Sequence, residues 1–124
     1  MIRTLILVGL GGGIGSVFRY LTSLYVTKYF QTAFPWGTLI VNILGSLVIG
    51  LLLGLFARGG LSHPDFKFLF VVGFCGGYTT FSAFSLESMT LFQSGNSFLA
   101  LLYIAASVLI SLFAVWIGLA VMKL

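Results

Sequence analysis

The sequence is poor in charge and in the side chains that build catalytic or metal sites. Only 6% of its 124 residues are charged, and it holds two acidic residues, one histidine and one cysteine. Because Cys75 is the only cysteine, an internal disulfide and a Cys-x-x-Cys metal motif are both excluded. His63, beside Pro64, has no neighbours in the sequence that would complete a zinc site, and we interpret it as a solvated loop residue. With no enzyme motif present, we predict that the chain is not an enzyme.

Apolar residues, by contrast, make up 60% of the sequence, and its mean hydropathy is +1.19. Values of this size are typical of an integral membrane protein. A spanning helix needs roughly 20 apolar residues, so the chain has room for about four helices in the lipid bilayer and little else. The net charge of +4 is modest, and basic residues in membrane proteins usually report topology or headgroup contact. We therefore expect one all-α membrane domain over residues 1–124 and no nucleic-acid partner.

Turn-forming residues divide the chain into four apolar stretches. They cluster at 32–35, 58–65 and 94–97. The first stretch begins like a signal peptide, but no small-residue cleavage site follows and it carries Arg19, so we expect it to be retained. The predicted membrane-spanning helices cover about residues 4–29, 37–57, 68–92 and 98–122.

The third span contains a polar segment, Gly76 to Ser85, that combines two glycines, several hydroxyls and two phenylalanines. A glycine pair followed by β-branched threonines lowers helix propensity. Inside a bilayer, a broken helix is tolerated only where its freed backbone groups face protein, water or an ion. We therefore predict that the third helix is broken near its middle and that the break is a permeation or ion site.

Two more polar residues lie within predicted spans, and each has two interpretations. Arg19, in the first span, either extends towards the headgroups or attracts anions into a vestibule, since an unpaired guanidinium is costly in a bilayer. Asn42, in the second span, either bonds to another helix or lines a pore. The sequence leaves both choices open.

The third and fourth spans each carry a face suited to an anion. Tyr103, Ser107 and Ser111 follow at four-residue steps and form a hydroxyl track, although each serine could instead bond the carbonyl one turn earlier. Phe81 and Phe84 are three residues apart, and their rings either pack against lipid or core, or present positive edges to an anion. The neighbouring hydroxyls of Thr80 and Ser82 would add hydrogen-bond donors there.

The loop charges bear on topology. With four spans, a group of four basic residues falls on one side of the membrane and Lys28 falls near the other. Taken alone, the positive-inside rule favours a chain with both termini in the cytoplasm, and we expect it in the cell inner membrane. The group of four consists of Arg3, Arg58, Lys67 and Lys123.

Three motifs together resemble the Fluc/CrcB fluoride channels. They are the segment from Trp36 to Asn42 (WGTLIVN), the segment from Gly73 to Ser85 (GFCGGYTTFSAFS) and the glycine-rich first span that runs from Gly11 to Arg19. The resemblance covers essentially the whole chain. It implies an antiparallel, dual-topology homodimer with two fluoride pores that exports cytoplasmic fluoride passively.

The resemblance also implies roles for individual residues. Asn42 would line the pore near its entrance, Phe81 and Phe84 would form its aromatic part, and the Tyr103, Ser107 and Ser111 hydroxyls would continue it. A structural sodium ion would lie at the dimer interface on backbone carbonyls at the helix break. Those carbonyls would belong to Gly76 and Thr79 of both chains, and oxygen ligands suit such a hard cation. Dual topology contrasts with the four-to-one loop charges, and we hypothesise that both orientations insert.

Two other functions remain open from the residues alone. Small multidrug exporters also have four short spans and dual topology, but they depend on a glutamate in the first helix, and this chain has only Glu87, late in the third. A non-transporting assembly subunit would explain small-residue packing faces but not the hydroxyl and aromatic residues. Loss of function in Glu87→Gln with pH-driven uptake would distinguish an exporter from a channel.

Overall fold

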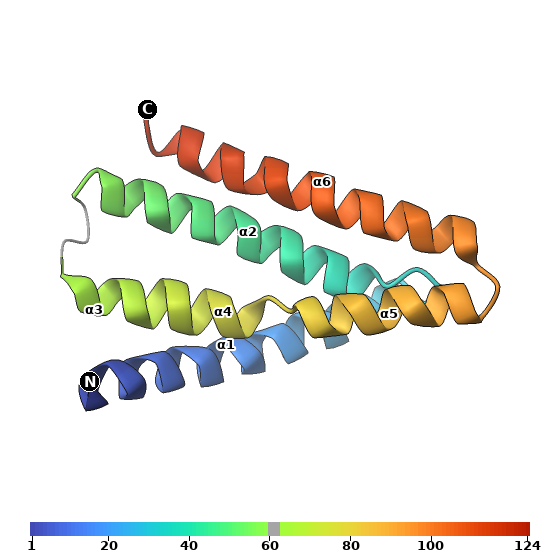
Figure 1. The fold of residues 1–124 in the computed structure, drawn as a ribbon, viewed down its shortest axis with the longest axis horizontal. Coiled ribbons are helices and arrows are strands. Elements are labelled where there is room, and N and C mark those ends of the chain that lie inside the picture. Colours follow the sequence, from blue (N-terminus) through green and yellow to red (C-terminus); the bar gives the residue numbers. More distant parts are fainter. Residues whose placement is uncertain (60–62) are drawn as a thin grey trace.

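The computed structural model describes residues 1–59 and 63–124, and every regular element within these two stretches is a helix (Figure 1). Four helical runs are long and apolar enough to cross a membrane. The chain is therefore a multi-pass membrane protein, which confirms the predicted all-α class. The elements are α1 (Ile2–Tyr29), α2 (Trp36–Ala57), α3 (Pro64–Phe66), the π-helical η1 (Lys67–Cys75), α4 (Gly76–Tyr78), α5 (Phe81–Gln93) and α6 (Ser97–Val121).

The third run begins at Pro64 rather than near residue 68. His63 caps this end, because its Nδ1 accepts a hydrogen bond of 3.1 Å from the backbone N–H of Asp65. Proline suits the first helical position, where its missing N–H is not needed. Of the turn predicted at 58–65, residues 60–62 lie outside the described part of the chain.

The predicted break in the third helix is present, and it lies at Thr79 and Thr80. Their backbone is extended, with φ −85°, ψ 159° at Thr79 and φ −150°, ψ 123° at Thr80. Gly76 and Gly77 remain helical in α4, just before the break (Figure 1). Figure 1 shows the connection between α4 and α5 as a short non-helical stretch near the middle of the molecule. β-branched side chains favour extended backbone, which explains why the threonines carry the break.

The helices pack in two main pairs. Helix α2 lies along α6, and α1 lies along η1 and α4 (Figure 1). Glycines make the second pair close: a methyl group on Gly77 would lie 2.8 Å from the Cα of Gly12, and one on Gly73 would lie 3.0 Å from the Cα of Gly11. The backbone of α1 therefore lies against the segment that leads into the break.

Both termini lie at the same end of the helices, together with the last turn of α2 and the start of α3 (Figure 1). Arg3 forms an ion pair with Asp65, and Arg58 Nη1 donates a 3.0 Å hydrogen bond to the Met122 carbonyl. These contacts hold Arg3 and Arg58 at this end, while Lys28 lies in the last turn of α1 at the other.

Candidate ion site

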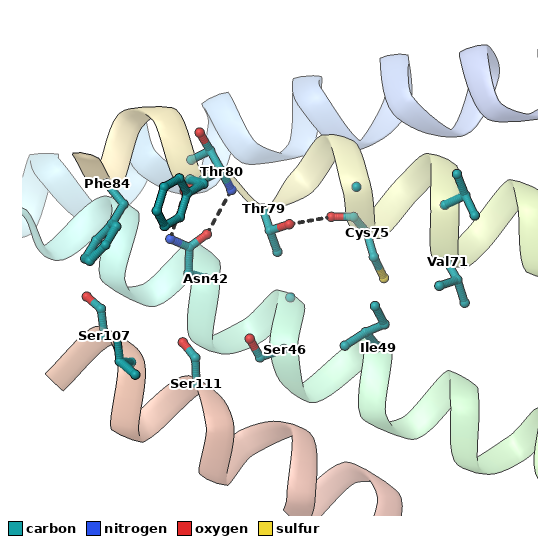
Figure 2. Close-up of a pocket in the computed structure, with 15 residues that line it drawn as sticks. Asn42, Ser46, Ile49, Val71, Cys75, Thr79, Thr80, Phe84, Ser107 and Ser111 are labelled. Atoms are coloured by element: carbon teal, nitrogen blue, oxygen red, sulfur yellow. Dashed lines mark hydrogen bonds between the residues drawn. The ribbon is translucent and has the colours of Figure 1, made fainter. Parts of the chain in front are cut away.

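A groove of about 580 Å³ lies beside the break, between α2, the third helical run and α6 (Figure 2). It brings together eight of the residues predicted for the pore or the sodium site. Ser82, Tyr103 and Arg19, which were also predicted, do not line it. The eight are Asn42, Gly76, Thr79, Thr80, Phe81, Phe84, Ser107 and Ser111.

Asn42 bonds the broken backbone from both of its amide atoms. Its Oδ1 accepts a 3.0 Å hydrogen bond from the Thr80 N–H, and its Nδ2 donates a 3.2 Å hydrogen bond to the Thr80 carbonyl (Figure 2). The side chain thus makes the inter-helix contact that was one of its two interpretations. Because an amide nitrogen carries two hydrogens, one N–H is left beyond this pair, and Asn42 lines the groove as well.

The hydroxyls near the break cap the helix ends. Thr80 Oγ1 accepts a 3.1 Å hydrogen bond from the Ala83 N–H and so caps α5. Ser82 Oγ lies 3.2 Å from the same oxygen, at an exposed position. Thr79 Oγ1 donates a 2.8 Å hydrogen bond to the Cys75 carbonyl (Figure 2). Hydroxyls of the break therefore bond to backbone groups of both helices that meet there.

The phenylalanine rings are neighbours, as their spacing predicts. The centroids of Phe81 and Phe84 are 5.7 Å apart with the ring planes at 49°. Phe84 continues the contact to Tyr103, with centroids 5.3 Å apart. Phe84 and Ser107 lie close together at one end of the groove (Figure 2). A tilted ring can turn its positive edge towards an anion, so the arrangement is suited to weak anion contact.

The hydroxyl track on α6 divides into two parts. Tyr103 is fully buried, and its hydroxyl donates a 3.3 Å hydrogen bond to Oε2 of Glu87. Ser107 is 6% exposed, and its hydroxyl has no hydrogen-bond partner among the described residues, so it does not bond the carbonyl one turn earlier. Ser107 and Ser111 both line the groove (Figure 2). A buried hydroxyl without a partner is costly, and an ordered water or an ion is the usual explanation for such a group.

Glu87 belongs to a small network that the sequence analysis missed. Its Oε1 accepts a 2.7 Å hydrogen bond from Thr38 Oγ1, in addition to the bond from Tyr103. Thr38 lies one helical turn before Asn42, on the same face of α2. This spacing is the feature of the sequence that could have pointed to Thr38. The contacts give Glu87 a structural partner on two helices.

A second cavity, of about 190 Å³, also has Thr80 in its lining. Arg19 and Glu87 both line it, together with Ser23 and Thr38, which the sequence analysis did not single out. The Arg19 Nε donates a 3.2 Å hydrogen bond to the Gly77 carbonyl. Thr80 is thus the residue that the lining of this cavity shares with the lining of the groove.

Backbone carbonyls are the cation ligands that this site offers. Within residues 1–59 and 63–124, no group of three or more His, Cys, Asp or Glu side chains could hold a metal. Gly76 and Thr79 line the groove, and across the described chain no hydrogen bond reaches their carbonyls. Neutral oxygens of this kind suit a hard monovalent or divalent cation.

Comparison with known proteins identifies the family. The sequence pattern described as "CrcB-like protein, Camphor Resistance (CrcB)" matches residues 6–119. The chain belongs to the CrcB family. A relative from Flavobacterium psychrophilum is 49% identical over 98% of both chains, and one from Rhizobium johnstonii is 48% identical over 95% of this chain and 94% of its own. Both are named "Fluoride-specific ion channel FluC".

The CrcB match confirms the family that the motifs indicated, and it spans every residue discussed in the site, from Arg19 to Ser111. Another relative, from Azobacteroides pseudotrichonymphae, carries the same name and is 42% identical over 95% of this chain. Membership in this CrcB family of fluoride-specific ion channels favours the channel over the exporter and the assembly subunit.

Proposed function

We propose that this chain forms a fluoride-selective channel through which cytoplasmic fluoride leaves the cell passively and electrogenically, across the inner membrane. The observation that carries the proposal is the groove beside the break, which combines the Phe84 ring with the Ser107 hydroxyl that no described group satisfies. Hydroxyls and ring edges replace water around a small anion without a strong charged trap. Weak contacts of this kind suit conduction. The relatives named as fluoride-specific channels support the choice of anion.

The proposed pore uses the residues around the groove. Asn42 lies near its entrance, Phe81 and Phe84 form its aromatic part, and Ser107 and Ser111 supply hydroxyls. Thr80, Ser82 and Tyr103 support these side chains from the break and from α6. Arg19 lies outside this set, in the second cavity.

We further propose that two chains form an antiparallel homodimer with two pores. Phe81, a groove residue, is 79% exposed in the single chain, as expected of a site that a second copy completes. A two-fold axis in the membrane plane would bring the two breaks together. One sodium ion could then bind the Gly76 and Thr79 carbonyls of both chains, where it would hold the dimer together rather than be transported.

Current recordings in planar bilayers test the proposed selectivity. With a tenfold fluoride gradient and equal chloride on both sides, a fluoride-selective channel reverses at about 59 mV, the value for a tenfold ratio of a univalent ion. A reversal potential near zero would show that chloride carries the current as well, and coupling of fluoride movement to a proton gradient would favour an exporter.

Removal of the Ser107 hydroxyl should lower fluoride transport without lowering stability. Ser107→Ala deletes a buried group that has no described partner, so we expect thermal stability to be unchanged or slightly higher. We expect fluoride flux to fall about tenfold, since the hydroxyl no longer replaces water around the ion. Ser88→Ala is the matched control, because Ser88 is equally buried but bonds the Phe84 carbonyl at 2.8 Å and does not line the groove. Equal flux in both variants would remove Ser107 from the pore.

Replacement of sodium should act on flux without changing selectivity. If the cation is structural, complete and slow exchange for a large organic cation weakens the dimer and lowers fluoride flux several-fold, while the reversal potential stays the same. Flux should recover when sodium is restored. Unchanged flux after verified exchange would contradict the sodium site.

Cysteine labelling tests dual topology. We would place one cysteine at Ser94, an exposed position between α5 and α6, in a Cys75→Ala background. Gly95 is a poorer choice because its φ of +87° strains other residues. If both orientations are inserted, about half of the protein reacts with an impermeant reagent in intact cells, and the rest reacts only after permeabilisation. Reaction from one side alone would overturn the antiparallel dimer.

A further inference from the structure

The break frees backbone groups that must find partners within the membrane, and most of those partners come from outside the third helix. Thr79 keeps its helical hydrogen bond to the Cys75 carbonyl at 3.0 Å. At Thr80 the helical series of backbone hydrogen bonds is interrupted, and the Thr80 N–H donates instead to the Asn42 side chain on α2. The Gly77 carbonyl, whose helical donor would have been the Phe81 N–H, accepts instead from Arg19 on α1.

Glycines place Arg19 at this carbonyl. Gly11, Gly15 and Arg19 follow at four-residue steps, so they lie on one face of α1. Gly11 and Gly15 are buried against the backbone of η1, and neither has room there for a methyl group. The close approach continues to α4, where Gly77 touches Gly12. The next turn of this face brings the guanidinium to the end of α4.

We propose that Arg19 is a positioning residue of the helix break: by holding the Gly77 carbonyl, it fixes the direction of the Gly76 and Thr79 carbonyls on either side. The proposal deepens the proposed function, on which its transport readout rests. It differs from a role as an attracting charge, because the Nε hydrogen bond and not the net charge does the positioning. Across the described residues, the Gly76 and Thr79 carbonyls accept no protein hydrogen bond, so their geometry depends on neighbours such as Gly77.

Two neutral variants separate the hydrogen bond from the charge. In Arg19→Gln, the amide nitrogen lies as many bonds from the backbone as the Nε of arginine, so the donor to Gly77 is kept while the charge is lost. Arg19→Met has a similar length and neither donor nor charge. Both variants would be compared with the natural chain in two measurements. Amide hydrogen exchange over residues 79–83 would be measured on protein purified in detergent, and fluoride flux at increasing sodium would be measured in vesicles.

We expect Arg19→Met to speed amide exchange across the break and to raise the sodium concentration for half-maximal flux about tenfold, the factor that corresponds to about 1.4 kcal/mol. Arg19→Gln should stay within about twofold of the natural chain in both measurements, a rescue that a role in attracting anions does not predict. A general loss of folding would lower stability, but the protein that remains folded would keep the same sodium concentration for half-maximal flux.

Two other outcomes overturn the proposal, and a third separates it from the proposed function. If both variants lose flux equally while exchange is unchanged, Arg19 acts through its charge. If neither variant changes exchange or sodium dependence, Arg19 does not position the break. If the natural chain carries no fluoride but only Arg19→Met speeds exchange, the positioning role stands and the proposed function fails.

Discussion

Phe84→Leu should lower fluoride flux at least tenfold while the protein still folds. Leucine keeps much of the apolar bulk in contact with Tyr103 and Phe81, but it has no ring edge to offer an anion. Phe84 lines the groove beside the Ser107 hydroxyl, which has no partner among the described residues (Figure 2). The substitution therefore removes the ring edge next to the hydroxyl on which the proposed pore depends. Fluoride-electrode recordings from vesicles with matched protein content would measure it.

Phe98→Leu provides the matched control. Phe98 lies in the first turn of α6, is 80% exposed and does not line the groove. We expect its flux to stay within about twofold of the natural chain. If Phe84→Leu conducts as well as Phe98→Leu, the aromatic part of the pore is wrong and Phe84 is a packing residue.

Asn42→Ala should have the second large effect, and here stability and flux should fall together. The substitution leaves the Thr80 N–H and carbonyl without their side-chain partner, inside the membrane-spanning part of the chain. Each buried backbone group left unsatisfied costs about 1–3 kcal/mol. We expect lower thermal stability and a loss of fluoride flux of about a hundredfold, since a few kcal/mol at the break disturbs the pore that surrounds it.

Asn96→Ala is the control for this variant. Asn96 is exposed in the turn before α6, and among the described residues its side-chain amide bonds to Ser94 Oγ alone, at 3.3 Å. Thermal unfolding in detergent and vesicle flux would be measured on both proteins. Normal stability of Asn42→Ala would show that the two hydrogen bonds to Thr80 are dispensable.

The sequence predicts the large features of this fold well because they depend on composition. Four apolar stretches and the polar segment in the third are visible without any knowledge of contacts. The position of the break at Thr79 and Thr80 is harder to predict, because it depends on which residues pack. Gly76 and Gly77 also lower helix propensity, yet they remain helical because α1 packs against this part of the chain.

The partners of the polar side chains could not be predicted in the same way. Asn42 and Arg19 both bond to backbone groups, at Thr80 and Gly77, and a backbone carbonyl or N–H carries no signal in the sequence. The link from Glu87 to Thr38 depends on the relative rotation of α2 and α5, which periodicity within one helix does not fix. Chemical type thus points to eight of the residues that line the groove, whereas the contacts that hold them depend on the packing of the helices.

If the proposed function is correct, this chain alone makes a membrane permeable to fluoride and not to chloride. The most direct test is fluoride efflux from liposomes that contain only the purified protein, with a potassium gradient, with and without valinomycin, and with parallel chloride-loaded vesicles. We expect rapid fluoride release that requires valinomycin, because electrogenic movement needs a compensating cation, while chloride is retained. No fluoride release from demonstrably folded protein, or equal release of chloride, would contradict it.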